Sequence, residues 1–125
     1  MKKRILLVED DPWSIDLIDR ELKVLGYEVS IAKNGVQAVE MVASDPPDLI
    51  VMDILMPRMD GLQAATHIKN NPKTQGIPIL AATAKALPGD KEKCLAAGCD
   101  GYIAKPFTYK ELGAAIEELL KKLAR

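Results

Sequence analysis

The stretch that decides the fold runs from residue 5 to residue 12 and reads Ile-Leu-Leu-Val-Glu-Asp-Asp-Pro. A short, continuous apolar run of this kind is typical of a strand that is buried on both faces of a parallel sheet. Asp11 followed by Pro12 is a typical helix start, because the aspartate caps the helix and proline suits its first position. The stretch therefore predicts a buried strand that leads directly into a helix, with acidic side chains between the two.

The same succession recurs along the whole chain. Apolar runs cover residues 49–52, 77–82 and 102–104, and a weaker one covers residues 28–31. Between and after these runs, apolar residues recur at steps of three and four, which is typical of helices that bury one face. They are Ile15, Ile18, Leu22 and Leu25, then Val36, Val39 and Val42, then Leu62, Ala65 and Ile68, and finally Leu112, Ile116, Leu119 and Leu123. Five strands that alternate with helices predict an α/β protein.

Residues that start and stop helices separate these segments. They are Gly26, Gly98 and Pro72 at helix ends, and Asn34 with Gln37 and Thr108 with Glu111 as capping-box pairs at helix starts. Because connections between parallel strands are right-handed, the alternation predicts a doubly wound sandwich of three layers, with a parallel five-stranded sheet between two layers of helices.

The composition limits the possible functions. The chain has 125 residues, of which 48% are apolar and 28% charged, and these values exclude a disordered chain. A net charge of −1 argues against a nucleic-acid binder that works through a basic face. His67 is the only histidine, so catalysis that relies on histidine is nearly excluded. We expect a single domain over residues 1–125, with no effector domain.

The start of the chain and its cysteines favour a cytoplasmic location. The apolar run at residues 5–8 stops after four residues, too short for a signal peptide and far short of the ~20 residues of a membrane span. We therefore expect no membrane association. Cys94 and Cys99 lack the second pair or neighbouring histidine of a zinc site. We expect both to be reduced and buried, with a redox pair as the alternative.

Polar residues follow four of the predicted strands at the same relative place. Glu9 and Asp10 follow the first strand, Asp53 the third, Thr83 the fourth and Lys105 the fifth. In an open parallel sheet, ligands bind outside the carboxyl ends of the strands. Each residue alone has a purely structural explanation, such as a helix cap or a solvated charge. Together they indicate a binding site at one edge of the sheet.

The residue types in this set favour phosphoryl chemistry. Three carboxylates repel one another unless a cation joins them, and a few hard oxygen ligands in an open site suit Mg²⁺ better than zinc. Lys105 and Thr83 offer a positive charge and a hydroxyl to phosphoryl oxygens. An aspartate can attack phosphorus and form an acyl phosphate. Asp53 stands alone at the end of a central strand, so we expect it to be the acceptor.

From Arg4 to about Leu123 the chain resembles the response-regulator receiver domains of bacterial two-component signalling, in particular single-domain, chemotaxis-regulator-like members. The residues that carry the resemblance keep the order and spacing of the family, and they are Val8-Glu9-Asp10, Asp53-Ile54-Leu55-Met56-Pro57, Asp60-Gly61, Ala82-Thr83-Ala84 and Lys105-Pro106. The resemblance implies a flavodoxin-like (βα)5 fold with strand order 2-1-3-4-5. It also implies a signalling switch that catalyses only its own phosphorylation and autodephosphorylation, and so is not an enzyme.

The resemblance also assigns roles to individual residues. Mg²⁺, for which Mn²⁺ could substitute, would be held by Asp10, Asp53, the backbone carbonyl of Leu55 and, through water, Glu9. Asp53 would be the phosphoacceptor, Thr83 and Lys105 would contact the phosphoryl group, and Tyr102 matches an aromatic switch position. The Lys105–Pro106 peptide bond is cis in much of the family.

The family also implies partners. The phosphodonor would be a histidine kinase or a histidine-phosphotransfer protein, and the downstream target would be a protein that the sequence does not identify. Two surfaces are candidates for these contacts: an apolar collar near Trp13, Ile15, Pro106 and Phe107, and an output face that includes Leu87, Tyr102 and Tyr109.

Three alternatives remain. The chain could be a receiver from a hybrid histidine kinase or a longer regulator. A metal-dependent phosphohydrolase with Asp53 as nucleophile would need a second aspartate at position 55, where the chain has Leu55. A nucleotide- or flavin-binding domain would need a glycine-rich loop after the first strand, where the chain has Glu9, Asp10 and Asp11.

Overall fold

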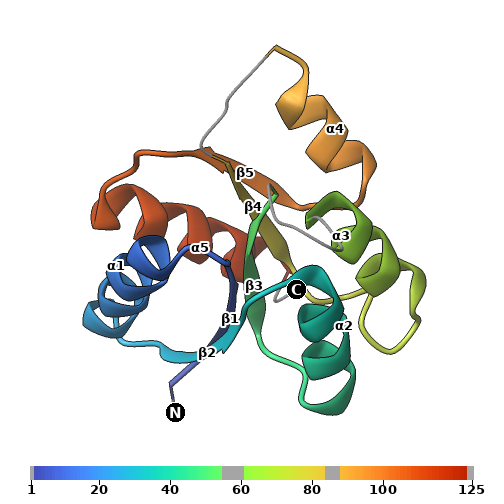
Figure 1. Cartoon of the computed structure of the whole chain (residues 1–125), viewed down its shortest axis with the longest axis horizontal. Coiled ribbons are helices and arrows are strands. Elements are labelled where there is room, and N and C mark those ends of the chain that lie inside the picture. The colour runs from blue at the N-terminus through green and yellow to red at the C-terminus, as the bar shows by residue number, and fades with distance from the viewer. Residues whose placement is uncertain (1, 55–60, 84–87, 124–125) are drawn as a thin grey trace.

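A five-stranded sheet with helices on both faces forms the molecule in a computed structural model, which describes residues 2–54, 61–83 and 88–123 (Figure 1). Strands and helices alternate along the chain. The strands are β1 (Arg4–Val8), β2 (Glu28–Ala32), β3 (Leu49–Asp53), β4 (Ile79–Thr83) and β5 (Gly101–Ala104). The helices are α1 (Pro12–Val24), α2 (Gly35–Ser44), α3 (Gly61–Asn70), α4 (Asp90–Ala96) and α5 (Tyr109–Leu123).

All neighbouring strands are parallel and lie in the order β2-β1-β3-β4-β5, which confirms the predicted topology. Helices α1 and α5 cover one face of the sheet, and α2, α3 and α4 cover the other (Figure 1). Successive residues of a strand point to opposite faces, so Ile5 and Leu7 pack under α1 and α5 while Leu6 and Val8 pack on the other side. Burial on both faces explains why the strands are continuous apolar runs.

Helix boundaries agree closely with the capping signals. Asp11 accepts a hydrogen bond from the backbone N–H of Ser14 at 3.0 Å at the start of α1. The N–H of Gln37 donates to Asn34 Oδ1 at 2.8 Å, and the N–H of Glu111 donates to Thr108 Oγ1 at 3.1 Å. The two glycines that were expected to end helices, Gly26 and Gly98, have φ angles of 96° and 104°.

Two details of the predicted pattern are wrong. Val36 is 38% exposed, whereas Val42 is buried and Val39 packs against the core as expected. Gly35 and Ala38 complete the buried face of α2, and the apolar spacing did not indicate these small residues. Strand β4 begins at Ile79 and not at residue 77, since Pro78 has no N–H to donate to a neighbouring strand.

The half-buried side chain of Lys69 forms hydrogen bonds to three segments of the chain, at the edge of the sheet where the strands begin. Lys69 Nζ donates to the carbonyl oxygens of Gln75 and Ile77 at 3.0 and 2.7 Å and to Asp100 Oδ2 at 2.8 Å. The same Asp100 oxygen accepts from the N–H of Ile79 at 2.8 Å. No local sequence pattern indicates this network, because its members are up to 31 residues apart.

We expect the Lys69→Met substitution to lower the free energy of unfolding by about 2 kcal/mol, since it leaves a partly buried carboxylate and two carbonyl oxygens without their cation. Urea denaturation measures the change. The exposed Lys73 lies four residues away, and Lys73→Met should change stability by less than about 0.5 kcal/mol. Equal changes in the free energy of unfolding for Lys69→Met and Lys73→Met would show that the hydrogen bonds and ion pair of Lys69 do not stabilise the fold.

Candidate functional site

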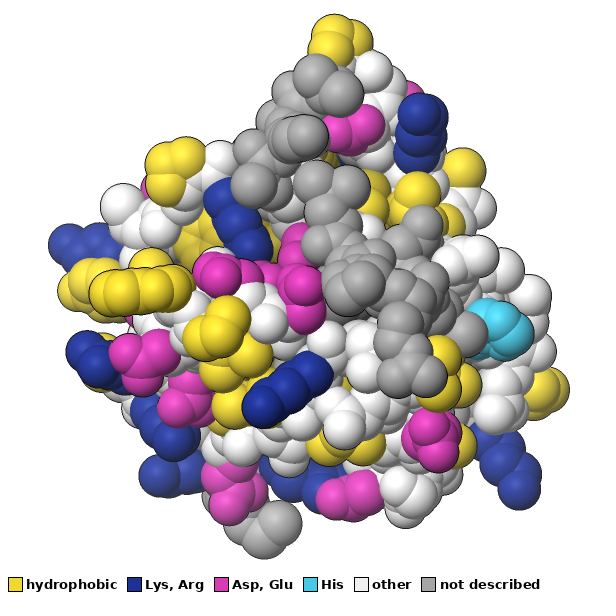
Figure 2. Space-filling view, in the orientation of Figure 1, with side chains coloured by type: hydrophobic (Ala, Val, Ile, Leu, Met, Phe, Trp, Pro, Cys, Tyr) yellow, Lys and Arg dark blue, Asp and Glu magenta, His cyan; other side chains and the backbone are white. Residues whose placement is uncertain are grey.

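Three carboxylates meet at the carboxyl ends of β1 and β3. Glu9 and Asp10 directly follow β1, and Asp53 is the last residue of the neighbouring strand β3. Each of the three offers an oxygen atom, and these atoms all lie within 4.8 Å of one another. Glu9 is 1% and Asp53 7% exposed, whereas Asp10 is open to solvent. Figure 2, which views the molecule from the same side as Figure 1, shows acidic side chains gathered near the middle of the visible surface, beside a basic side chain.

The carboxylate of Glu9 already has partners on both oxygens. Lys105, which follows β5, places Nζ 2.5 Å from Glu9 Oε1. Glu9 Oε2 accepts weaker hydrogen bonds from the backbone N–H groups of Asp10 and Asp11 at 3.2 and 3.4 Å. The sequence placed Lys105 at this edge of the sheet, but its pairing with Glu9 across 96 residues was not foreseen.

Thr83 lies at the same edge as the three carboxylates. It is the last residue of β4, the strand next to β3, and it is 3% exposed. Asp53 pairs with Ala82 in the register of the two strands, so Thr83 and Asp53 end neighbouring strands at nearly the same level. The predicted strand-end residues Glu9, Asp10, Asp53, Thr83 and Lys105 are therefore brought to one edge of the sheet. Leu55, the predicted carbonyl ligand, lies outside the described residues.

The donor atoms of this cluster fit a small divalent cation. Among the described residues, Lys105 offsets one of the three carboxylate charges, and a cation would neutralise the excess that remains. The ligand atoms are hard carboxylate oxygens, and the opening to solvent beside Asp10 leaves room for water ligands, as Mg²⁺ requires. Glu9 is engaged with Lys105 and two amides, so we expect it to contact a bound cation less directly than the more exposed Asp10.

Tyr102 lies on β5, half-buried, with the acidic first turn of α4 nearby. Burial, and to a smaller degree Asp90, raises the pKa of the Tyr102 hydroxyl. The tyrosine therefore stays protonated and can donate a hydrogen bond. The Lys105–Pro106 peptide bond is cis. Leu87, the predicted neighbour of Tyr102 on the output face, lies outside the described residues.

Both cysteines are buried, as the sequence predicts. Cys94 lies in α4 and Cys99 follows the helix, and the N–H of Cys99 donates to the Cys94 carbonyl at 3.0 Å. Burial, assisted by the nearby Cys94, raises the pKa of the Cys99 thiol to about 12. Because thiolates and not thiols react, Cys99 behaves as a small apolar side chain.

An apolar stripe on α1 stands beside the acidic cluster. Trp13, Leu17 and Val24 are 85%, 59% and 76% exposed, and apolar side chains project from the edge of the molecule where α1 lies (Figures 1 and 2). The sequence singled out Trp13 and Ile15. Ile15 is instead half-buried, and the spacing of Leu17 and Val24 to Trp13 was the missed signal.

The other predicted contact residues differ in exposure. Pro106 and Tyr109 are exposed, whereas Phe107 is half-buried and packs against the core under α1 and α5. His67 is exposed on α3, away from the strand ends that carry the carboxylates. The collar predicted from Trp13, Ile15, Pro106 and Phe107 is thus only partly open to solvent.

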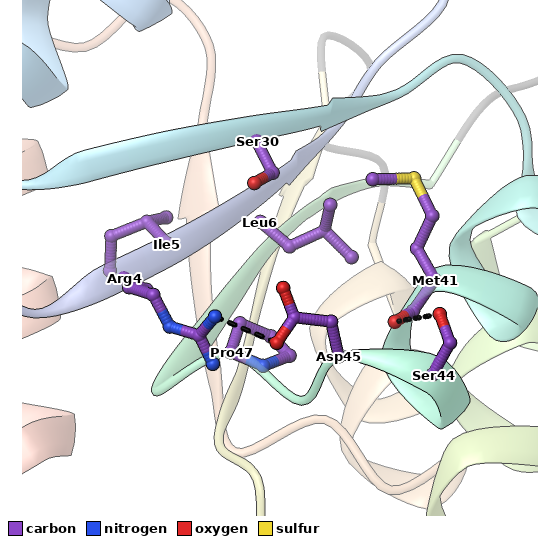
Figure 3. Close-up of a pocket in the computed structure, with 8 residues that line it drawn as sticks. All are labelled: Arg4, Ile5, Leu6, Ser30, Met41, Ser44, Asp45 and Pro47. Carbon is purple, nitrogen blue, oxygen red and sulfur yellow. Dashed lines mark hydrogen bonds and ion pairs between the residues drawn. The ribbon is translucent and has the colours of Figure 1, made fainter.

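A separate pocket lies between β1, β2 and the end of α2 (Figure 3). Its polar groups partner one another: Arg4 Nη1 lies 2.8 Å from Asp45 Oδ1, and the Ser44 hydroxyl donates to the Met41 carbonyl at 3.3 Å. Arg4 begins β1, whereas Glu9 follows the end of that strand, so the pocket and the acidic cluster are at opposite ends of the sheet.

Within the described part of the chain, no helix is long and apolar enough to span a membrane.

Comparison with protein families places this geometry among known proteins. The model of the response regulator receiver domain matches residues 5–117. The response regulator MprA of Mycobacterium ulcerans is 40% identical over 122 residues, which cover 98% of this chain and 52% of the relative. MprA of Mycobacterium leprae is 41% identical over 119 residues, or 95% and 51% of the two chains. The chain thus spans about half the length of the curated relatives it matches.

Solved structures give the same result. One similar structure is the receiver domain of the sensor histidine kinase PA1611 of Pseudomonas aeruginosa PAO1, which was solved with a magnesium ion in its active-site cleft. It superposes with a TM-score of 0.91 at 39% sequence identity, and the match covers 97% of this chain and 99% of the PA1611 chain. The chemotaxis protein CheY4 of Vibrio cholerae superposes with a TM-score of 0.89 at 26% identity, covering 95% and 99% of the two chains.

Proposed function

The chain belongs to the response regulator receiver domain family, and we propose that it works as a Mg²⁺-dependent switch that accepts a phosphoryl group on Asp53. One observation carries the proposal: the nearly buried carboxylate of Asp53 lies within 4.8 Å of the Glu9 and Asp10 oxygens, at the edge of the sheet where Lys105 supplies a cation. A carboxylate whose neighbouring negative charges can be neutralised by a cation is a suitable nucleophile for phosphorus.

The proposed reaction transfers a phosphoryl group from nitrogen to oxygen. An oxygen of Asp53 forms a bond to phosphorus while the P–N bond of the donor breaks. The electron pair of that bond leaves with the nitrogen, which departs as neutral imidazole when the other ring nitrogen carries a proton. The product is an acyl phosphate, and its subsequent hydrolysis by water would regenerate Asp53.

Three groups would hold the reacting phosphoryl oxygens. Asp10 and Asp53 would bind Mg²⁺ directly, and Glu9 would bind it through water. The bound ion, for which Mn²⁺ could substitute, would neutralise negative charge between Asp53 and the incoming group. Lys105 would leave Glu9 or share its ammonium with a phosphoryl oxygen, and Thr83 would donate its hydroxyl.

Phosphorylation would then shift the conformational equilibrium of the face formed by α4, β5 and α5. The modification adds nearly two negative charges beside the buried end of β4, and a move of Thr83 toward them would open space for Tyr102. The protonated Tyr102 hydroxyl could then reach new acceptors inside the domain. Tyr109, which is exposed, would belong to the surface that a downstream protein reads.

The proposal is tested by incubating the protein with phosphoramidate and Mg²⁺ and measuring the intact mass. We expect the addition of one phosphoryl group per chain, with loss of the label on treatment with hydroxylamine, which cleaves acyl phosphates. An unchanged mass at millimolar Mg²⁺ would contradict the proposed function.

The physiological donor would be a histidine kinase or a histidine-phosphotransfer protein that docks beside Asp53. The exposed stripe of Trp13, Leu17 and Val24 on α1 begins three residues after Asp10 of the acidic cluster. Charged side chains between these residues pair within the helix, Asp16 with Arg20 and Asp19 with Lys23, so the stripe presents apolar surface. Apolar anchors of this kind are typical centres of protein interfaces.

We expect Trp13→Ala to slow phosphotransfer from the cognate histidine-phosphotransfer protein at least about tenfold, because large aromatic side chains dominate binding energy at interfaces. Labelling by phosphoramidate, which needs no docking, is the internal reference. Val36→Ala, which truncates an exposed apolar side chain on α2, is the matched control. An equal rate of phosphotransfer to Trp13→Ala and to Val36→Ala would show that α1 is not part of the docking surface.

The remaining expectations stay predictions. They are a stand-alone domain without an effector, the alternative of a receiver from a longer protein, a cytoplasmic location and independence from nucleic acid. A phosphotransfer screen against the histidine kinases of the source organism would identify the partner most directly.

A further inference from the structure

Gly61, the first residue of α3, lies directly against the backbone of the proposed phosphoacceptor. A methyl group built on Gly61 would collide with the carbonyl oxygen of Asp53 and would lie 2.7 Å from the Cα atom of Ile54 and 2.9 Å from its Cδ1. Real Cβ atoms essentially never come closer than 3.0 Å to other heavy atoms. Two of the three atoms belong to the main chain of the strand end, which cannot turn away as a flexible side chain can.

Hydrogen bonds hold this strand end from two sides. The N–H of Gly61 donates to the carbonyl oxygen of Ile54 at 3.1 Å, and the N–H of Ile54 donates to the carbonyl oxygen of Ala82 in β4 at 3.1 Å. Asp53 itself pairs with Ala82 in the register of the sheet. The backbone at Asp53 and Ile54 is therefore fixed between β4 and the first residue of α3.

We propose that Gly61 is a positioning residue for the phosphoacceptor. Because Gly61 has no side chain, the first turn of α3 can pack directly against the Asp53 backbone. This contact sets the position of the Asp53 carboxylate relative to Glu9 and Asp10. The inference rests on the proposed function of Asp53. Any larger residue at position 61 pushes the strand end away from α3. The carboxylate oxygen of Asp53 then moves relative to those of Glu9 and Asp10, which lie within 4.8 Å of it in the present arrangement.

The Gly61→Ala variant tests this role. A displacement of a few tenths of an ångström at reacting groups is expected to lower the rate of labelling by phosphoramidate about tenfold and to weaken Mg²⁺ binding, measured by calorimetry, by a similar factor. Two controls add the same methyl group elsewhere. Gly76→Ala meets no atom within 4 Å, and in Gly113→Ala, buried in α5, the three atoms nearest to the new methyl group belong to the flexible Leu25 side chain. Both should stay within about twofold of the parent in rate and affinity.

A second variant separates backbone from side-chain effects. Ile54→Val removes the Cδ1 atom that the new methyl group would touch but leaves the two main-chain contacts. The double variant Ile54→Val with Gly61→Ala should therefore remain as slow as Gly61→Ala. Restoration of the parent rate and Mg²⁺ affinity would overturn the proposal, because the clash would then lie in the Ile54 side chain.

Loss of folding is distinguished from loss of positioning by circular dichroism. If Gly61→Ala is partly unfolded, trimethylamine N-oxide is added to all variants until its spectrum matches that of the parent, and rates are compared there. A rate and an affinity equal to those of the parent would overturn the inference. If the parent itself is not labelled, the proposed function fails, and the Mg²⁺ affinities of the variants alone decide the role of Gly61.

Discussion

Asp53→Asn is expected to reduce phosphorylation by phosphoramidate to background. The asparagine amide has nearly the shape of the carboxylate, but its oxygen is too weak a nucleophile to attack phosphorus and no acyl phosphate can form. The substitution also removes one of three neighbouring negative charges, so we expect the variant to remain folded, with a thermal midpoint no lower than that of the parent in Mg²⁺-free buffer. Intact-mass measurement after incubation with donor and Mg²⁺ gives the labelled fraction.

Asp16→Asn is a suitable control for this experiment. Asp16 is exposed on α1 and pairs with Arg20, so its substitution removes one negative charge outside the cluster of Glu9, Asp10 and Asp53. It should be labelled like the parent. Equal labelling of Asp53→Asn and Asp16→Asn would show that the phosphoryl group is carried elsewhere.

Removal of Mg²⁺ with EDTA is expected to slow labelling at least about a hundredfold, the magnitude typical of lost electrostatic stabilisation in a transition state. Without Mg²⁺, an anionic donor approaches three neighbouring carboxylates, of which Glu9 is paired with Lys105. Asp10→Asn should resemble EDTA treatment even at millimolar Mg²⁺, because Asp10 is the accessible carboxylate of the cluster.

The thermal midpoint of unfolding tests Mg²⁺ binding at the same site without requiring phosphorylation. Because Mg²⁺ relieves repulsion among the three carboxylates and binds only the folded chain, it should raise the thermal midpoint of the parent and of Asp16→Asn. The midpoint of Asp10→Asn should respond much less. A midpoint of the parent that does not move with Mg²⁺, together with labelling that survives EDTA, would contradict a metal-dependent mechanism.

The fold was predictable because its signals are local. Each buried strand is a short apolar run, and each capping pair lies within four residues, as with Asn34 and Gln37. The errors arose where packing overrides pattern. Val36 is exposed on α2, whereas Gly35 and Ala38 are buried, and a search for large apolar residues at helical spacing selects valine before glycine or alanine.

The site was predictable in its members but not in their contacts. A parallel sheet brings the carboxyl ends of its strands to one edge, so the positions of Glu9, Asp53 and Lys105 after apolar runs were sufficient to group them. The pairing of Lys105 with Glu9 depends on the packing of segments 96 residues apart. The close approach of Gly61 to Asp53 likewise depends on where α3 rests, and no local pattern specifies it.

The partner surfaces were the least predictable part. Spacing shows that Trp13, Leu17 and Val24 share one side of α1, but only the structure shows that this side is left uncovered by α5 and β2. The output face is known only around Tyr102 and Tyr109, since Leu87 lies outside the described residues.

The most direct test of the account is to locate the phosphoryl group by tandem mass spectrometry in the parent protein, after labelling with phosphoramidate and conversion of the acyl phosphate by borohydride reduction. We predict modification at Asp53 alone, dependent on Mg²⁺ and absent in EDTA. A label on His67, on another carboxylate, or on Asp53 to the same extent without Mg²⁺ would contradict the claim that Glu9, Asp10 and Asp53 form a metal-assisted phosphoacceptor site.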